Sequence, residues 1–544
     1  MTGVSRRRFM KHTAVAGGAA LALPAMGGWA GEAFAAEPPA AASVAGPNLV
    51  TVGPTDPRYA PLVACANGRW TGTPAYVLVA STVDQVVQAV QETLNNGLRF
   101  AVRSGGHCYE DFTTNSGVRV LIDISAMTGI SYDSARRAIA VDAGAQLGNV
   151  YQTLYNTWGV TIPGGTCPTV SVGGHIPGGG YGPLARSHGL TVDHLYAIEI
   201  VHVDSTGTAC KVVATRDASD PHRELWWAHT GAGGGNYGIV TRYWFRTPGA
   251  TGNDPAFLLP KAPTSLVVSE VTFSWTGMTE PAFTQLLYNF TAWHQANTSA
   301  TSPHAKLFSA IKPRHRAAGE FLMSTQLDAS VPNADAVMDA YLAAIVAGTG
   351  LTYRVDVRKH VDWLYNVLNW PGLGGPGFEN KGRFKAKSSY LRKTMPVAQI
   401  KEFYKHLTRT DYTNGAALVE IAGYGATTNL PSSHATATAQ RDSIIKMLFV
   451  NLWATPAEDA VNLAWIREFY RDVHAATGGV PRPGVINDGA FINYADSDLA
   501  DPALNTSGTP WSTLYFKDGY HRLQSAKALW DPLNVFRHAL SVRV

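Results

Sequence analysis

The sequence predicts an α+β protein with two parts. In the first part, up to about residue 250, strand-like and helix-like segments alternate and glycine-rich turns follow some of them. In the second part, strands and helices continue to alternate without such turns. Glycine-rich turns let backbone N–H groups converge on an anion. We therefore expect the first part to hold a phosphorylated cofactor and the second part to cover it.

Several elements of the first part follow from the apolar pattern. Residues 76–80 are expected to form a strand, and Ser81 or Thr82 is expected to cap an amphipathic helix over 83–94. Gly159 is placed to end a later helix. The other expected elements are strands at 98–102, 118–123 and 138–142 and a helix at 147–158.

The second part and the C-terminal tail continue this alternation. A strand is expected at 266–273 and helices at 281–295 and 333–346, and the tail from Trp511 is expected to return to the first part. The predicted organisation is a signal peptide (1–35), a linker (36–48), a cofactor-binding domain (49–250), a substrate domain (251–489) and a returning C-terminal segment (490–544).

The N-terminus has the features of a twin-arginine export signal. Arg6, Arg7 and Arg8 precede a weak apolar run rich in small residues, and a triplet typical of cleavage follows at 33–35. This route carries folded proteins, which suits a protein that binds its cofactor before export. The alternatives are a disordered basic N-terminus and a membrane anchor. We predict a secreted, extracytoplasmic protein with no membrane anchor after cleavage.

Charge and cysteine content argue against several classes of protein. The formal net charge of +4 falls to +1 without residues 1–35, because that segment holds four basic residues and one acidic residue. No basic stripe remains, so no nucleic-acid partner is predicted, and no metal site is predicted either. Four cysteines in 544 residues are too few for a disulfide scaffold. A disulfide among Cys65, Cys108 and Cys210 stays open.

Two glycine-rich loops each present one nucleophilic side chain. His107 lies in the loop at 103–109 and Cys167 in the loop at 164–174, and both loops follow predicted elements. Two nucleophiles around one phosphorylated cofactor indicate a flavin held by two covalent bonds. The alternatives are a loop histidine bonded to its own backbone and a small buried thiol.

These loops and three further motifs, at 231–241, 385–390 and 492–499, resemble the berberine bridge enzyme-like branch of the FAD-linked oxidases with the vanillyl-alcohol-oxidase fold. The resemblance implies a PCMH-type FAD-binding domain of two α/β subdomains, and a substrate domain of antiparallel sheet covered by helices. It also implies FAD bonded through its 8α-methyl group to His107 and through carbon 6 to Cys167. Such attachment is expected to raise the reduction potential of the flavin.

The loops and their neighbours supply the remaining predicted cofactor contacts. Backbone N–H groups of the first loop are expected to hold the pyrophosphate, with the Ser104 hydroxyl as a further donor. The glycines of the second loop are expected to lie against the ring, although a string of tight turns is the simpler alternative. Besides His107 and Cys167, the predicted cofactor residues are Arg103, Ser104, Gly105, Gly106, Gly173, Gly174, Gly179, Gly235, Asn236, Ile239, Val240 and Asn493.

Catalysis in this family needs a base that takes the hydroxyl proton of the substrate. In berberine bridge enzyme the base is a glutamate, and the matching position within 446–449 is expected to be apolar here. Tyr181 and Tyr494, the latter expected on a late strand, are therefore the predicted catalytic residues. A phenol, with a pKa of about 10, needs a nearby cation, hydrogen-bond donors or the flavin to lose its proton. The alternative for each tyrosine is a place in the core.

The resemblance implies a secreted oxidase that converts a secondary hydroxyl of an antibiotic or its sugar to a carbonyl and reduces O₂ to H₂O₂. The alternatives are an oligosaccharide oxidase acting at the anomeric carbon, a flavin dehydrogenase that excludes O₂, and a non-catalytic binding protein. The predicted partners are a small-molecule substrate and O₂. Substrate identity and oligomeric state stay open.

Overall fold

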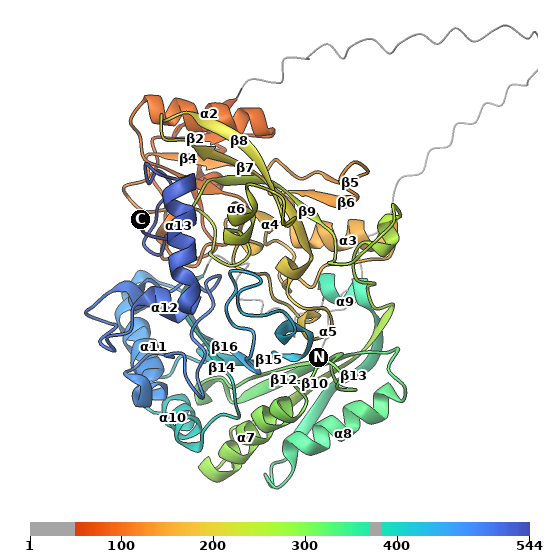
Figure 1. Ribbon diagram of the computed structural model, residues 1–544. Coiled ribbons are helices and arrows are strands. Elements are labelled where there is room, and N and C mark those ends of the chain that lie inside the picture. The colour runs from red at the N-terminus through yellow and green to blue at the C-terminus, as the bar shows by residue number, and fades with distance from the viewer. Residues whose placement is uncertain (1–48, 370–381) are drawn as a thin grey trace, which may run out of the picture. The chain divides into compact units, whose positions relative to one another are not determined.

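The computed structural model describes residues 49–369 and 382–544 (Figure 1). The predicted signal peptide and linker lie outside the described residues. The first sheet has four strands in the order β1-β2-β4-β3, and β1 is antiparallel to β2 whereas β2, β4 and β3 pair in parallel. Its strands are β1 (Val50–Val52), β2 (Tyr76–Val79), β3 (Phe100–Arg103) and β4 (Val120–Asp123).

The helix after β2 shows how the local sequence sets these elements. Helix α2 (Val83–Asn95) begins after Thr82, whose side chain accepts a hydrogen bond from the Gln85 N–H, as an N-cap threonine does. The prediction of a helix over 83–94 is confirmed, with Thr82 as its cap. Strand β3 then leads directly into the first glycine-rich loop.

A five-stranded antiparallel sheet follows, in the order β5-β6-β9-β7-β8. After β6, helix α3 (Leu147–Trp158) ends at Gly159, whose φ of 65° is left-handed and favours glycine. The chain then forms the second glycine-rich loop and two short helices, α4 (Val172–His175) and α5 (Ala185–His188). The strands are β5 (Ile130–Asp133), β6 (Ala138–Asp142), β7 (Leu195–Val203), β8 (Ala209–Thr215) and β9 (Ile239–Phe245).

The later strands form a seven-stranded antiparallel sheet in the order β13-β10-β12-β11-β15-β16-β14. Helices lie along one face of it (Figure 1), and Phe403 and Phe469 from two of them contact Phe449 of β16. Because side chains alternate along a strand, Lys446 of β16 faces the opposite way. The strands are β10 (Ser265–Ser274), β11 (Leu307–Lys312), β12 (Glu320–Asp328), β13 (Tyr353–Asp362), β14 (Arg383–Leu391), β15 (Leu418–Gly423) and β16 (Ile445–Trp453), and the helices are α7 (Glu280–Ala296), α8 (Ala334–Val346), α10 (Val397–Thr408) and α11 (Asp459–Val473).

The C-terminal residues pack against the glycine-rich segment that precedes β9. The Tyr237 hydroxyl donates to the Leu523 carbonyl at 3.3 Å, and the Lys527 ammonium donates to the Asn236 carbonyl at 2.6 Å.

In the described part of the chain, no helix is both long and apolar enough to cross a bilayer. The division at residues 250 and 489 stays a prediction. The remaining helices are α1 (Tyr59–Val63), α6 (Arg223–Ala228), α9 (Trp363–Asn369), α12 (Trp511–Phe516) and α13 (Tyr520–Trp530).

Replacing Lys527 with methionine is expected to lower the free energy of unfolding by about 3–5 kcal/mol, because it leaves a buried carboxylate without its partner. Lys527 and Asp531 are both fully buried and paired, and the ammonium also donates to the Phe536 carbonyl at 2.6 Å. Urea unfolding measures the loss. The control is Lys401→Met, since Lys401 is 58% exposed. Equal losses in both variants would contradict the role of Lys527.

Candidate active site

The two predicted nucleophiles meet at one hydroxyl group. His107 Nε2 lies 3.0 Å from the Thr169 hydroxyl oxygen, and Cys167 Sγ lies 3.3 Å from the same oxygen. Burial, together with the positive charge of Arg103, lowers the pKa of His107. The imidazole is therefore neutral at neutral pH, and a ring lone pair is available to attack an electron-poor carbon.

An ion pair stabilises the start of the first loop. Arg103 Nη1 lies 2.6 Å from a carboxylate oxygen of the fully buried Asp123. Gly106 has a φ of 72°, and a Cβ there would lie 2.9 Å from the Arg103 guanidinium, so the turn requires glycine. The Ser104 hydroxyl donates to the Ala143 carbonyl at 2.7 Å. The hydroxyl predicted to be a further donor to the pyrophosphate is thus already used within the protein. The contact of the Ser104 backbone N–H with the pyrophosphate stays a prediction.

Glycine also lets the two loops pack closely together. A Cβ on Gly105 would lie 2.8 Å from the Ser171 nitrogen, and a Cβ on Gly173 would lie 2.8 Å from the Ser104 hydroxyl. Gly174, in contrast, faces open space, with no described atom within 4 Å of its Cβ position. Two nucleophiles beside an open glycine surface fit a planar group held at its edge. The residues present therefore fit a flavin.

Filling this open space is expected to reduce flavin binding without unfolding the protein. Gly174 lies in helix α4, where alanine favours the helix over glycine by about 0.5–1 kcal/mol. A Gly174→Ala protein should keep its Tm and carry less FAD per chain, measured by absorbance. Gly53→Ala is the control, because Gly53 also faces open space but lies outside both loops. The same FAD content in both variants would contradict the placement of the flavin.

Asn236 holds the third glycine-rich segment in shape. Its side-chain amide donates to the carbonyls of Ala232 at 3.1 Å and Gly233 at 3.0 Å, and its side-chain oxygen accepts from the Val542 N–H at 2.8 Å. The side chain is thus fully used inside the protein. These bonds fix the shape of the loop, and the predicted contact of Asn236 with the cofactor stays a prediction.

The other predicted residues of this group lie in turns or in strand β9. Gly179 and Gly235 have φ of 110° and 74°, conformations that favour glycine. Ile239 and Val240 are the first two residues of β9, and both are buried. Their positions are compatible with the prediction, which rests on the sequence.

Asn493 joins the second glycine-rich loop to the segment of Tyr494. Its side-chain amide donates to the His175 carbonyl at 2.8 Å. A Cβ on Gly178 would lie only 2.0 Å from its side-chain oxygen. The contact therefore depends on glycine at position 178. Because Asn493 directly precedes Tyr494, the contact also fixes the position of the Tyr494 backbone relative to the loop of Cys167.

Both predicted catalytic tyrosines lie around one buried lysine. Lys446 Nζ lies 3.8 Å from the centre of the Tyr494 ring, 4.6 Å from that of Tyr181 and 4.8 Å from that of Phe491. These distances are within the range of cation–π contacts. The Tyr494 N–H donates to the Phe491 carbonyl at 2.9 Å in a turn, so the predicted strand at Tyr494 is wrong.

Burial sets the ionisation of these three side chains. It lowers the pKa of Lys446 to about 7, against the opposing effect of the Glu420 carboxylate. It raises the pKa of Tyr181 and of Tyr494 well above the ordinary value of a phenol. The Tyr181 hydroxyl also donates to the Gly423 carbonyl at 2.6 Å. Of the three groups, Lys446 is the one that can gain or lose a proton near neutral pH.

Comparison with known proteins places the chain in a family. The model for an FAD binding domain matches residues 74–212, and the model described as berberine and berberine like matches residues 490–543. The chain is 51% identical to aclacinomycin-N/aclacinomycin-A oxidase of Streptomyces galilaeus, over 99% of this chain and 98% of that protein. The chain belongs to the berberine bridge enzyme-like FAD-linked oxidoreductases.

Solved structures share the fold of this berberine bridge enzyme-like chain. Aclacinomycin oxidoreductase is 51% identical with a TM-score of 0.87, covering 91% of this chain and 100% of that one. A glycopeptide hexose oxidase solved with teicoplanin is 46% identical with a TM-score of 0.87, covering 92% and 99%. Hexose oxidase of Chondrus crispus is 31% identical over 91% of this chain and 95% of that protein. The predicted α+β, PCMH-type FAD-binding fold is confirmed, and the protein is an FAD-dependent oxidoreductase that acts on CH–OH groups.

Lys446 is the site residue of this berberine bridge enzyme-like chain that the sequence prediction misses. The prediction treats 446–449 only as a stretch without a carboxylate base, and the stretch indeed contains none. A single charged residue in a largely apolar strand is the signal that points to it, because a buried charge is costly unless something in the protein requires it.

The cysteines support the assignment of Cys167. All four are free, and the Cys65 thiol donates to the Cys108 carbonyl at 3.1 Å. Burial raises the pKa of both Cys65 and Cys108. Cys108, although next to His107, therefore stays protonated and is a poor nucleophile.

One group of described residues has ligand atoms close enough to hold a metal ion: Glu402, His406 and Asp472. Lys405 Nζ already lies 2.7 Å from Glu402 and 3.2 Å from Asp472. The lysine balances both carboxylates, so we assign this group to the contact between α10 and α11.

Proposed function

We propose that this protein is an oxidase with doubly attached FAD. It converts a secondary hydroxyl of a natural product, or of the sugar that the product carries, to a carbonyl, and it reduces O₂ to H₂O₂. The observation that carries the proposal is the convergence of His107 and Cys167 on Thr169 in a chain of this family. We further propose that residues 1–35 direct export of the folded protein by the twin-arginine route.

The geometry supports attachment at two positions on one ring of the flavin. The 8α-methyl group and carbon 6 belong to the same benzenoid ring, with carbon 7 between their attachment points, so two nucleophiles that lie close to one hydroxyl can each reach one of them. His107 supplies the lone pair of a neutral imidazole, and Cys167 supplies its sulfur. Attachment along one edge leaves a face of the ring open to the substrate.

The protein's own residues account for the proton that leaves the substrate hydroxyl. When bound, FAD supplies the acceptor for the hydride that leaves the carbinol carbon. Tyr494 or Tyr181 takes the hydroxyl proton as a phenolate. Burial opposes that charge on both phenols, so a cation is needed beside them, and Lys446 lies 3.8 Å from the centre of the Tyr494 ring.

Two relatives support a sugar on a larger natural product as the substrate. One is named for its action on aclacinomycin, and a hexose oxidase was solved with teicoplanin. A second candidate is a free hexose or oligosaccharide oxidised at the anomeric carbon, which the similarity to hexose oxidase of Chondrus crispus supports.

Oxygen consumption and peroxide formation with two groups of substrates test the proposal. Glycosylated natural products, including aclacinomycin and teicoplanin, form the first group, and free hexoses and oligosaccharides form the second. Turnover with one peroxide per carbonyl in the first group supports the proposal, and turnover in the second group alone supports anomeric oxidation. Enzyme that stays reduced in air would be a dehydrogenase. A colourless protein would exclude a flavin oxidase.

Export is tested by replacing Arg6, Arg7 and Arg8 together with lysine. The folded, flavin-loaded variant is expected to accumulate inside the cell while the wild type is found in the medium, because the twin-arginine pair is the element that this route reads. Cell fractionation followed by flavin fluorescence measures the distribution. Equal amounts of both proteins in the medium would contradict the proposed route.

A further inference from the structure

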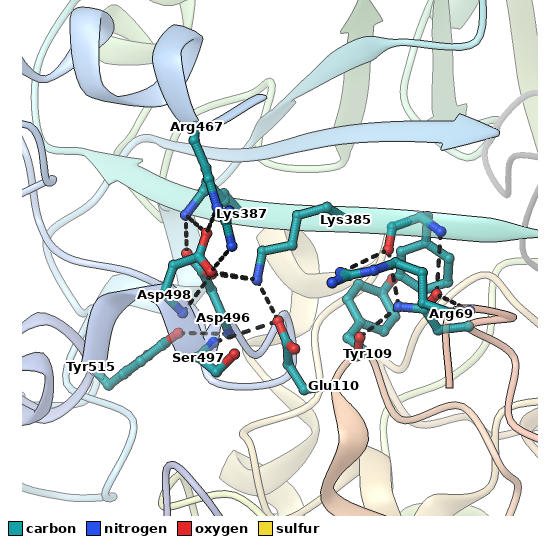
Figure 2. Close-up of polar contacts among 12 residues, drawn as sticks. Arg69, Tyr109, Glu110, Lys385, Lys387, Arg467, Asp496, Ser497, Asp498 and Tyr515 are labelled. Carbon is teal, nitrogen blue, oxygen red and sulfur yellow. Dashed lines mark hydrogen bonds and ion pairs between the residues drawn. The ribbon is translucent and has the colours of Figure 1, made fainter. Parts of the chain in front are cut away.

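A buried cluster of charged side chains lies around Lys385 (Figure 2). Lys385 Nζ lies 2.5 Å from a carboxylate oxygen of Glu110 and 2.8 Å from one of Asp496. Three carboxylates face three cations, and all but the arginine are almost fully buried. The members of this charge cluster are Glu110, Lys385, Lys387, Arg467, Asp496 and Asp498.

Lys385 is the member that joins separate segments of the chain. It belongs to β14, whereas Glu110 follows the first glycine-rich loop and Asp496 belongs to the C-terminal segment. Burial alone would favour a neutral amine, but Asp496, Glu110 and Asp498 outweigh it and raise the pKa of Lys385. The lysine is therefore a permanent cation that holds all three carboxylates at one point.

The joined segments carry two stacked rings of the active site. Glu110 directly follows Tyr109, and Asp496 lies two residues after Tyr494. The rings of Tyr109 and Tyr494 stack with their centres 5.4 Å apart and 8° between their planes. The ion pair of Lys385 and Glu110 thus acts one residue away from this stack.

Asn67 ties the same segments at the level of the backbone. It is fully buried, and its side-chain amide donates to the carbonyls of Tyr109 at 2.8 Å and Phe384 at 3.0 Å. Phe384 precedes Lys385 and meets the Tyr109 ring edge-on, with ring centres 5.1 Å apart. Two independent polar contacts therefore set the position of Tyr109 against β14.

The cluster is not accounted for by stability alone. Replacing a buried ion pair with apolar side chains is often neutral, or stabilising by about 1–4 kcal/mol. What a fully paired buried network adds is a fixed geometry. Geometry matters at this place, because a shift of about 1 Å in a reacting group can slow a reaction about 100-fold.

We propose that Glu110 and Lys385 are positioning residues for the reaction. Their ion pair holds the loop that carries His107 against the segment that carries Tyr494. His107 lies three residues before Glu110, so the same contact fixes the flavin-bonding side chain relative to the proton acceptor. This inference rests on the proposed function, and the two residues act through the stack of Tyr109 on Tyr494.

A double variant, Glu110→Gln with Lys385→Met, separates positioning from stability. It removes one negative and one positive charge, so the four remaining members of the cluster stay balanced. We expect a Tm close to that of the wild type, together with flavin reduction slowed at least about tenfold, a KM within about threefold and a shifted pH profile of reduction. Arg467→Gln is the control. Arg467, 36% exposed, binds Asp498 from the outer side, and its loss is expected to leave the reduction rate unchanged.

A second readout needs no substrate. After denaturation, mass spectrometry gives the fraction of chains bonded to flavin through both His107 and Cys167, which we expect to fall in the double variant and to stay complete in Arg467→Gln. A stable double variant with complete bonding and the wild-type rate and pH profile would overturn the positioning role. A wild-type protein without covalent flavin would instead overturn the proposed function, and this inference with it.

Discussion

A Lys446→Met protein is expected to reduce its flavin about 100-fold more slowly than the wild type, a loss typical for one preorganised electrostatic group. Lys446 is almost fully buried, and its Nζ lies 3.8 Å from the centre of the Tyr494 ring. Without it, a phenolate at Tyr494 loses the cation beside its ring. Methionine packs well against aromatic rings, so folding should not suffer. Anaerobic stopped-flow reduction measures the rate, and thermal unfolding measures the Tm.

Lys446→Arg is the matched control. Arginine keeps a positive charge and also stacks on aromatic rings, so this variant should retain more of the rate than Lys446→Met. Because a guanidinium does not lose its proton in this range, the pH dependence of reduction near 7 should disappear. A Lys446→Met protein with the wild-type rate and pH profile would remove the lysine from the reaction.

The same lysine predicts how stability changes with pH. Burial lowers the pKa of Lys446 to about 7, whereas a lysine in the unfolded chain has a pKa of about 10.4. Between these values the unfolded state binds more protons, so this residue makes the folded state more stable as pH rises from about 7 to about 10. Below pH 7 its cost is constant. Urea unfolding at pH 7 and pH 9 should show this increase in the wild type relative to Lys446→Met.

His107→Ala and Cys167→Ala are each expected to leave the flavin held by one bond, and the double variant to release it on denaturation. The two side chains converge on the Thr169 hydroxyl, at 3.0 Å and 3.3 Å. Each lost bond should lower the reduction potential. For a two-electron couple, a potential lower by about 30 mV makes flavin reduction about tenfold less favourable at equilibrium, so flavin reduction should also slow. Flavin fluorescence of the denatured chain and a redox titration measure both effects.

Cys108→Ala is the control for the cysteine variant. Its thiol lies next to His107 in the sequence, but burial raises its pKa and keeps it protonated. Both bonds should therefore form in Cys108→Ala. Loss of the cysteine bond in that variant, or its persistence in Cys167→Ala, would show that Cys167 is not the attached cysteine.

Local elements of the fold could be predicted because their signals are local. Helix α3 ends where Gly159 permits a left-handed turn, and α2 begins at the threonine that caps it. The order β1-β2-β4-β3 of the first sheet could not be predicted, because strand order depends on contacts far apart in sequence. The strand predicted at Tyr494 is instead a turn closed by the Phe491 carbonyl, and Tyr494 lies beside Lys446, a contact between distant parts of the sequence.

The active site divides in the same way. His107 and Cys167 stand out because each sits in a glycine-rich loop, and glycine patterns can be seen in a single sequence. Lys446 contacts the rings of Tyr181, Phe491 and Tyr494, which only the folded chain brings together around it. The charge cluster likewise joins Glu110 to Lys385 of β14, which lies 275 residues later in the sequence. No local pattern carries such information.

One flavin is proposed to join the two glycine-rich loops. Protease digestion of the denatured wild-type protein, followed by mass spectrometry of the yellow fraction, tests this most directly. We expect one flavin that links two peptides, one containing His107 and the other Cys167. Flavin released on denaturation, or a flavin bonded to a single peptide, would contradict it.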